Sequence, residues 1–324
     1  MTRYLARRLL LTIPMLFGIT FLTYTIISFT PGGPAAGLMG DLNPKVSDEY
    51  RQNLIKQYNF DKPLLVQYGL WIKNILRLDL GESIKDRKPV IEKIAERLPR
   101  TILLSGLSML VSFLLAIPLG ILSALKRNSI WDKGITVFVY AGYAMPIQWI
   151  ALLVLIFFGI QLGWLPVTGF RSIMADEMTF WDRQVDLARH LILPIMVTGL
   201  LGLAGMTRYM RSSMLEVLNQ DYIRTARAKG LSEKRVIFVH GLRNSLLPII
   251  TIMGMSLPEL ISMSVIVEVI FSFPGIGRLA YEAAITRDIF LIMGTVTFTA
   301  FLTLLGNLIA DVAYAYADPR IRYR

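Results

Sequence analysis

The stretch "DYIRTARAKGLSEKRVIFVHGLRN", residues 221–244, carries six Lys or Arg residues and lies between long apolar segments. The chain around it has 324 residues, of which 54% are hydrophobic and 18% are charged. Soluble domains carry about 25% charged residues, so the chain is unusually apolar. In a soluble protein a net charge of +11 would suggest nucleic acid as a partner. The positions of the cations therefore decide between a nucleic-acid-binding protein and a membrane protein.

Long segments without Asp, Glu, Lys or Arg predict membrane spans, because a helix needs about 20 apolar residues to cross the hydrocarbon core. Five segments of this kind occur, at residues 9–29, 101–125, 134–163, 190–207 and 289–310. A sixth segment, 246–268, contains only Glu259 and a terminal Glu268 as charged residues. We therefore expect an all-α polytopic membrane protein with six transmembrane helices.

Two of these segments allow more than one interpretation. The segment 134–163 is long for one span, so either Pro146 breaks it or its helix tilts strongly. The first segment follows Arg3, Arg7 and Arg8, as in a signal peptide, but its apolar run exceeds the about 7–15 residues typical there. We expect a retained first helix.

The distribution of Lys and Arg predicts the orientation, because short cytoplasmic loops carry an excess of these residues. With six spans, the side that holds both termini carries 17 Lys and Arg in short segments, and the opposite side carries five. Residues 30–100 hold the remaining 12, but a segment of this length crosses the membrane largely regardless of its charge. Both termini and the stretch 221–244 are thus predicted to be cytoplasmic.

The predicted organisation has three parts. Residues 1–30 hold the cytoplasmic N-terminus and the first helix, and residues 31–100 form a helical extracytoplasmic insertion. Residues 101–324 form a five-helix membrane core with a cytoplasmic loop at about 208–245. The insertion is interpreted either as a cap over the membrane bundle or as a docking face for an extracytoplasmic partner. Ser47 is a candidate N-cap within it, followed by acidic residues in the first turn.

The stretch 221–244 is predicted to form a helix, a tight turn and a second helix. The residues from about Met214 favour a helix, and Gly230 ends it because Gly adopts the left-handed conformation at helix C-termini. Ser232 offers an N-cap for the second helix. Three interpretations compete: a loop whose cations only fix the topology, a DNA-binding helix-turn-helix, and a docking element for a cytoplasmic subunit. Anchoring at both ends in the bilayer disfavours DNA, and the ordered layout favours docking.

The sequence lacks the motifs of the common catalytic sites. Neither G-x-x-x-x-G-K-[ST], H-E-x-x-H nor G-x-S-x-G occurs, and there is no cysteine. His190 and His240 are the only histidines and are too far apart in sequence to suggest a metal site. We expect no catalytic residue, no metal site and no cofactor bound by this chain, which is therefore not an enzyme alone.

Glu259 lies near the middle of the predicted fifth span, where a charge is costly and usually faces a bundle interior or a watery cavity. Ser256 and Ser262 lie three residues to either side and extend the polar face. A protonated Glu259 bonded to a neighbouring helix, a lining group of a solute pathway and a proton relay are the three alternatives. As pathway residues we name Ser256, Glu259 and Ser262.

Several motifs together resemble the permease subunits of bacterial ABC importers of the peptide type, in particular the first of their two permeases. They are "RYLARRLLLTIPMLFGIT" (3–20), "PGGP" (31–34), "DKPLLVQYGLWIKNILRLDLGES" (61–83), "GWLPVTGF" (163–170), "TRYMRSSMLEVLNQDYIRTARAKGL" (207–231), "VEVIFSFPGIGRLAYEAAITRD" (267–288) and "DPRIR" (318–322). The cytoplasmic loop of importers in general reads E-A-A-x-x-x-G. Here Arg224, Thr225 and Ala226 take the first three places, and Gly230 takes the place of the Gly. The absence of the Glu makes a Glu-based contact doubtful in this chain.

The resemblance implies a type I importer fold and the rest of a transport machine in the bacterial inner membrane. Its partners would be a second permease, two cytoplasmic ATPases that bind ATP and Mg²⁺, an extracytoplasmic solute-binding protein and the lipid bilayer, without nucleic acid. The solute would be an oligopeptide or dipeptide, with nickel or glutathione as alternatives. An ATPase-independent secondary transporter that uses Glu259 is the alternative from another class. The residues expected to couple to the ATPase are Tyr222, Ile223, Arg224, Ala226, Arg227, Lys229, Gly230 and Leu231.

Overall fold

The computed structural model describes residues 2–40, 47–256 and 265–317, and the described chain is almost entirely helical. Five of its helices are long and apolar enough to cross a membrane. A pair of helices bent by 104° would make a sixth span if the pair counts as one. The prediction of an all-helical membrane protein is therefore confirmed at the level of five to six candidate spans.

The chain divides into two compact units, formed mainly by Met1–Thr101 with Pro274–Leu308 and by Ile102–Phe273 with Ile309–Ile321. The helices of the first unit are α1 (Thr2–Phe29), η1 (Gly33–Ala35), α2 (Ala36–Gly40), α3 (Asp48–Gln57), α4 (Leu64–Ile75), the first part of α5 (Val90–Leu125), α14 (Ile276–Ile285) and most of α15 (Ile289–Ala317). Ser47 caps α3 as predicted, because its side chain accepts a hydrogen bond from the Tyr50 amide. In the same unit the hydroxyl of Tyr24 on α1 donates to Gln67 on α4 at 2.7 Å.

A buried carboxylate organises the start of α15 in this first unit. Asp288 is 1% exposed, and its Oδ1 accepts a hydrogen bond from the Leu291 amide at 3.1 Å, so that it caps the helix. Its Oδ2 accepts from the Ser83 hydroxyl at 2.6 Å and from the Ile84 amide at 2.8 Å. One side chain thus fixes the loop before α5 to the beginning of α15.

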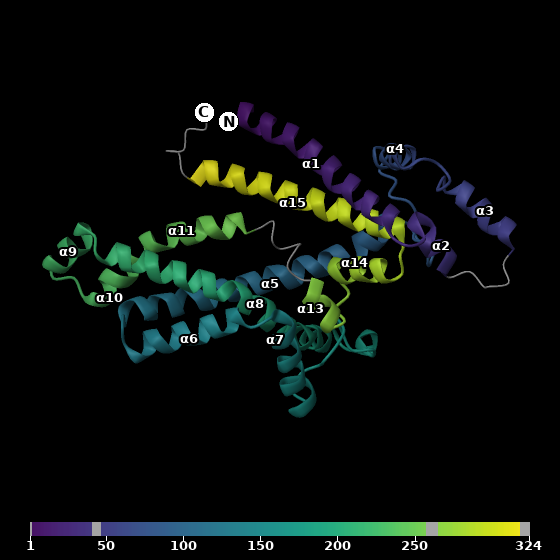
Figure 1. Ribbon diagram of the computed structural model, residues 1–324. Coiled ribbons are helices and arrows are strands. Elements are labelled where there is room, and N and C mark those ends of the chain that lie inside the picture. Colours follow the sequence, from purple (N-terminus) through teal and green to yellow (C-terminus); the bar gives the residue numbers. More distant parts are fainter. Residues whose placement is uncertain (1, 41–46, 257–264, 318–324) are drawn as a thin grey trace. The chain divides into compact units, whose positions relative to one another are not determined.

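The second unit is built around one helix of 39 residues, α8 (Phe180–Leu218). Its other helices are the rest of α5, α6 (Ile130–Ala144), α7 (Ile147–Val154), η2 (Leu155–Gln161), η3 (Ala175–Glu177), α9 (Asp221–Ala228), α10 (Glu233–Arg235), η4 (Val236–Gly241), α11 (Leu242–Met255) and α13 (Val265–Ile270). Both α6 and α11 pack along α8 (Figure 1). Buried side chains of α5, α8 and α11, among them Phe113, Met210, Met214 and Ile249, form their common core.

The predicted long span 134–163 is broken at Pro146. Helix α6 ends at Ala144, and Pro146 is the N-cap of α7, which turns away from α6 by 104°. Helix α7 keeps contact with α8, because Ile150 and Ala151 pack against Leu193 and Val197. Proline lacks the amide hydrogen that would continue the α6 ladder, and this explains the position of the break.

Helix boundaries differ from the sequence prediction in three of the predicted spans. The expected boundary between insertion and second span at residue 100 lies inside α5, which runs from Val90 through Pro99 to Leu125. Helix α8 contains the predicted span 190–207 and extends beyond it at both ends. The candidate span that corresponds to the predicted segment 246–268 is Glu233–Gly254, so it begins earlier than residue 246.

Candidate functional site

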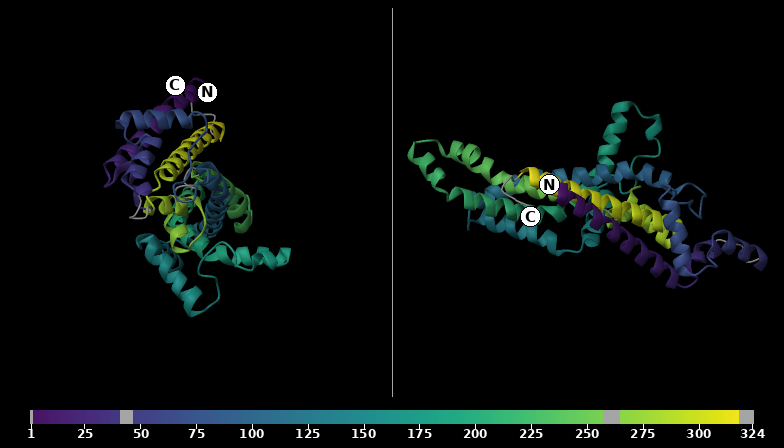
Figure 2. Two further views of the ribbon diagram at one scale, coloured as in Figure 1. Left: turned by 90° about the vertical axis from the view of Figure 1, so that its right-hand side faces the viewer. Right: turned by 90° about the horizontal axis from the view of Figure 1, so that it is seen from above.

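The predicted helix from Met214 to Gly230 is two helices in the structure. Helix α8 ends at Leu218, and α9 begins at Asp221. Between them Asn219 turns its side-chain amide back to the Leu215 carbonyl at 2.9 Å, and Gln220 is extended, with φ −73° and ψ 151°. Asn and Asp favour such helix ends because their side chains compete for backbone hydrogen bonds. The break separates α9 as a short helix at one end of its unit, beyond the C-terminal end of α8 (Figures 1 and 2).

The predicted coupling residues fall on two faces of α9 and the following turn. Ile223 is fully buried and Ala226 is 7% exposed, and both pack against Val236 of η4. Leu231 is half-buried in the same cluster. These apolar residues therefore attach α9 to the rest of the chain and do not form its outer surface. The exposed predicted residues are Tyr222, Arg224, Arg227, Lys229 and Gly230.

Gly230 closes α9 as predicted, with a left-handed φ of +76°. Its amide donates to the Arg227 carbonyl at 2.9 Å, and the Leu231 amide donates to the Ala226 carbonyl at 3.3 Å. This is the Schellman pattern of a helix C-terminus, completed by the apolar contact between Leu231 and Ala226. No heavy atom lies within 4 Å of a Cβ built on Gly230, so the backbone conformation is what requires Gly here.

An ion pair spans this turn. Arg227 on α9 donates from Nη2 to Glu233 Oε1 at 2.7 Å and from Nε to Oε2 at 3.2 Å. The hydrogen bond to Glu233 raises the pKa of Arg227. The two side chains are 44% and 55% exposed, so water screens the pair and its contribution to stability is below about 1 kcal/mol. Arg227 was predicted to contact the ATPase, and in the structure its guanidinium is paired with Glu233 of the same chain.

Two residues that the sequence analysis did not identify connect the helices at this end of the unit, one joining α9 to α11 and the other joining α8 to α11. Asn244 on α11 donates to the Tyr222 hydroxyl at 3.0 Å and to the His240 carbonyl at 3.0 Å. Ser213 on α8 donates to the Ser245 carbonyl at 3.0 Å. Helix α10 continues through the π-helix η4 into α11, so α9 is tied at both ends to long helices. No sequence pattern pairs Tyr222 with Asn244, which lies 22 residues further on.

A partly buried ion pair joins α6 and α8 near the same end of the unit, with the Arg211 side chain 32% and the Asp132 side chain 7% exposed. Arg211 donates from Nε to Asp132 Oδ1 at 2.9 Å and from Nη2 to Oδ2 at 2.8 Å. Asp132 is 5% exposed, and it also accepts from the Asn128 amide at 2.9 Å and from the Ser123 hydroxyl on α5. The carboxylate therefore holds the ends of three helices together. The sequence gives only a weak signal for this ion pair, because Asp132 and Arg211 lie at the edges of two separate apolar segments.

Of the three predicted pathway residues, the structure describes Ser256. Ser256 is the C-cap of α11, and its half-buried hydroxyl donates to the Ile252 carbonyl at 3.0 Å. Glu259 and Ser262 lie outside the described residues. The polar face that these three residues were predicted to form stays a prediction.

The fold and this site define a class of protein: a multi-pass helical membrane protein with a short helix at the end of its long spans. Comparison with known families matches residues 116–323 to the binding-protein-dependent transport system inner membrane component, and residues 1–105 to the N-terminal part of such membrane components. The chain belongs to this family of transport-system permeases of the bacterial inner membrane.

Relatives match the chain over its whole length. It is 45% identical to the oligopeptide transport system permease protein AppB of Bacillus subtilis, and both chains are covered completely. Its identity is 39% to the di/tripeptide transport system permease protein DppB of Pseudomonas aeruginosa and 36% to the dipeptide transport system permease protein DppB of Escherichia coli, again over all of each chain. A solved structure of the MetNI methionine ABC transporter in an inward-facing conformation shares the fold, with a TM-score of 0.53 and 14% identity over 70% of this chain and 97% of that one.

Proposed function

We propose that the chain is a permease subunit of an ATP-driven importer that moves oligopeptides or dipeptides into the cytoplasm. The observation that carries this proposal is the 45% identity over the complete length to an oligopeptide permease. Two further full-length relatives are also named for short peptides. Nickel and glutathione are the alternative solutes.

The proposed topology has six spans and cytoplasmic termini, with residues 31–100 outside. The count of six treats α6, α7 and η2 as one broken span. The support for the orientation is the excess of Lys and Arg in the short segments on the side of the termini. With this orientation α9 would lie in the cytoplasm.

The proposed partners are a second permease, two ABC ATPases and an extracytoplasmic solute-binding protein. ATP and Mg²⁺ would bind to the ATPases, and this chain would bind no cofactor and catalyse no reaction. Its own contribution is to convert closure of the ATPases into movement of its helices. Residues 101–324 would form the permease core.

We assign the contact with the ATPase to the exposed face of α9 and its turn, centred on Tyr222, Arg224 and Gly230. Ile223, Ala226 and Leu231 would transmit the movement, because they attach this face to η4. The bond between Tyr222 and Asn244 gives a second connection, to α11. A push on α9 would in this way reach both α8 and α11.

The decisive experiment is uptake into proteoliposomes that contain the copurified complex and its solute-binding protein. We expect two P-loop ATPases to copurify with the chain and ATP to drive uptake of a labelled tripeptide. Uptake of nickel or glutathione without peptide uptake would reject peptide as the solute. Uptake that needs no ATP and is lost in Glu259→Gln would reject the importer and favour the secondary transporter.

A further inference from the structure

Helix α4 packs against the apolar part of a candidate membrane span, although it belongs to the segment that the sequence predicts to lie outside the membrane. The Tyr68 hydroxyl of α4 donates to the Phe17 carbonyl of α1 at 3.1 Å and lies 2.9 Å from the Thr20 hydroxyl. Both partners are inside the candidate span Leu10–Phe29. Helix α4 therefore contacts α1 within the length that crosses the bilayer.

The position of these contacts along α1 gives the depth of α4. The hydrogen bonds of α4 reach α1 between Phe17 and Tyr24, which is about 8–18 Å from Phe29 at a rise of about 1.5 Å per residue. The hydrocarbon core is about 30 Å thick, so this is the half of the span that ends at Phe29. In Figure 1 α4 is seen along its axis and α1 from the side, so α4 crosses α1 and does not run along it.

One side of α4 belongs to the core of its unit. Trp71 is 8% exposed and packs in one cluster with Tyr24 of α1 and Met293 of α15. Tyr68 and Ile75, three residues before and four residues after Trp71, lie on the same side and join this cluster. This side attaches α4 to two candidate spans and fixes its rotation about its own axis.

A second side of α4 is apolar and uncovered. Leu65, Ile72 and Leu76 share it, because they follow one another at helical spacing, and Leu65 and Leu76 are 70% and 78% exposed. Ile72 and Leu76 line a groove of ≈ 170 Å³ against Ile13 and Leu16 of α1. These two residues of α1 lie farther from its C-terminal end than the hydrogen-bonded ones, so this side of α4 is directed toward the membrane interior.

The opposite edge of α4 is polar. Gln67 accepts a hydrogen bond from Tyr24, which is nearer the C-terminal end of α1 than the groove, and Asn74 lies seven residues after Gln67 on the same edge. Lys73 is two residues from Trp71 and therefore lies on the side away from the core, and both Lys73 and Arg77 are exposed. The polarity of α4 thus follows depth along α1, with apolar residues deeper and polar residues shallower.

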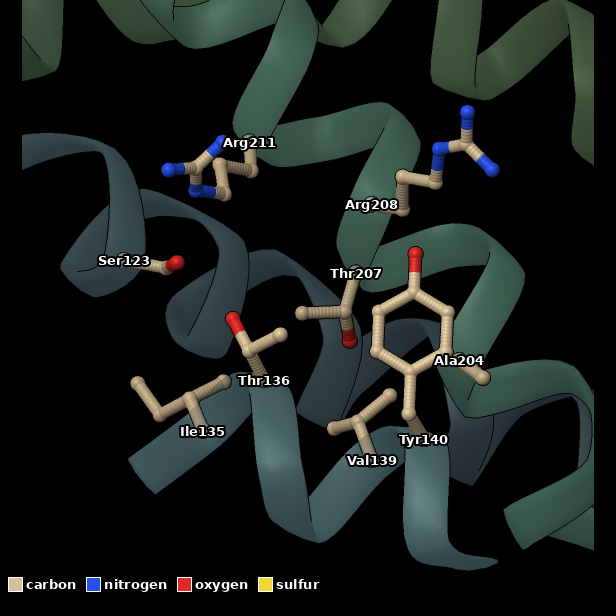
Figure 3. A pocket seen from close by; sticks show the side chains of 9 residues that line it. All are labelled: Ser123, Ile135, Thr136, Val139, Tyr140, Ala204, Thr207, Arg208 and Arg211. Carbon is tan, nitrogen blue, oxygen red and sulfur yellow. The ribbon is translucent and has the colours of Figure 1, made fainter. Parts of the chain in front are cut away.

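The groove shows what covers the apolar side. Its walls are almost entirely apolar, unlike the pocket beside Arg211 in the other unit, where hydroxyl and guanidinium groups line the space (Figure 3). Ile13 and Phe17 of α1 are 54% and 43% exposed, so the apolar side of α4 continues into the exposed surface of a candidate span. Because that surface faces acyl chains in a bilayer, the side of α4 that adjoins it meets acyl chains as well.

We infer that α4 lies in the membrane interface as an in-plane amphipathic helix that binds lipid. Leu65 and Leu76 insert among the acyl chains, and Lys73 and Arg77 reach the headgroup phosphates. The inference deepens the proposed topology, which would place α4 in the outer leaflet. The insertion 31–100 is then anchored to the bilayer through α4, while α3 lies farther out, beyond the end of α1 (Figure 1).

The test measures the depth of nitroxide spin labels, and the chain is suited to it because it contains no cysteine. The complex with its copurified subunits is placed in vesicles of phosphatidylglycerol and phosphatidylethanolamine. Oxygen, which enters the bilayer, and a water-soluble nickel chelate then compete to relax the label. We expect labels at Leu65→Cys and Leu76→Cys to collide preferentially with oxygen, several-fold more than a label at Gln52→Cys. Gln52 is exposed on α3 and is the control from the same insertion.

Two other results would overturn the proposal. Preferential collision with the nickel chelate at Leu65→Cys and Leu76→Cys would place the apolar side in water. Poor access of both reagents would show that a protein, such as the second permease, covers it. Oxygen enters both leaflets, so an error in the proposed orientation or in the transport role would leave the expected result unchanged.

A comparison within α4 tests the orientation of the helix. Asn74 is exposed like Leu76 but lies on the polar edge, so a label at Asn74→Cys should be several-fold more accessible to the nickel chelate. Leu76→Glu, added to Leu65→Cys, should raise the nickel access of that label, because a charge is costly among acyl chains. Asn74→Glu is the matched control and should leave it unchanged. Equal effects of the two glutamates, or equal depths at residues 74 and 76, would contradict the in-plane placement.

Discussion

Gly230 is the residue where sequence and structure agree most closely on backbone conformation, because the predicted left-handed helix end is observed there. A φ of +76° strains any residue with a Cβ, by about 1–2 kcal/mol, and strains β-branched residues most. Asn tolerates this conformation best among the residues with side chains. We expect Gly230→Val to reduce ATP-driven uptake strongly while ATP hydrolysis and membrane insertion persist, and Gly230→Asn to keep most of the uptake. Equal loss in both variants would mean that the side chain itself, and not the backbone, obstructs the partner.

The ion pair of Asp132 and Arg211 allows a prediction about stability at the same scale. Asp132→Asn keeps the shape but leaves the guanidinium opposite a neutral amide, so a charge-assisted bond worth about 1.5–3 kcal/mol is lost. The melting temperature of the purified chain in detergent should fall by several degrees. The control is Glu216→Gln, which removes the charge of an exposed residue on α8. It should change the free energy of unfolding by less than about 0.5 kcal/mol. Similar effects of the two variants would show that the pair of Asp132 and Arg211 has no special importance for stability.

At the scale of the element, the sequence predicted the two ends of α9 unequally well. The Gly230 end has a strong local signal, because one residue type alone suits the backbone there. The other end lies at Asn219 and Gln220, where the Asn219 side chain donates a hydrogen bond to a carbonyl of α8. Asn residues also occur inside helices, so the sequence does not mark this end clearly. The inward face of Ile223 and Ala226 could not be predicted either, since it depends on where Val236 lies in the folded chain.

Helix α5 offers a prediction about packing between elements. A Cβ on Gly120 would lie 2.6 Å from the Met210 Cβ and 3.0 Å from the Arg211 amide nitrogen of α8, whereas a Cβ on Gly106 meets nothing within 4 Å. We expect Gly120→Ala to destabilise the chain by about 1–3 kcal/mol through overpacking. Gly106→Ala should stabilise it by up to about 1 kcal/mol, because Ala favours the helix. Thermal unfolding of both variants in detergent is the measurement, and a neutral Gly120→Ala would contradict the close contact of α5 and α8.

At the scale of the whole molecule, composition sufficed to predict a helical membrane protein, and charge-free segments sufficed to locate most spans. The segment 134–163 shows the limit of this approach. Apolar length alone does not distinguish one tilted span, one broken span and a pair of helices that re-enters the same side. Pro146 explains the break. Whether the chain beyond the 104° bend crosses the membrane or returns to the same side decides the topology of the remaining helices.

Cysteine labelling answers this question, and the chain is suited to it because it contains no cysteine. Ile173 is fully exposed between η2 and α8, and Lys234 is exposed on α10. If α6, α7 and η2 form one broken span, a membrane-impermeant maleimide should label Ile173→Cys in intact spheroplasts. The same reagent should label Lys234→Cys only after permeabilisation. The unchanged chain is the control and should stay unlabelled under both conditions.

A re-entrant pair would give the opposite pattern. Residue 173 would then lie on the cytoplasmic side, and α8 would carry α9 and residue 234 to the outside, where no ATPase could reach them. The excess of Lys and Arg around α9 argues for the broken span, because these residues are strongly biased toward the cytoplasm. Labelling of Lys234→Cys in intact spheroplasts would therefore reject both the six-span topology and the assignment of α9 to the ATPase contact.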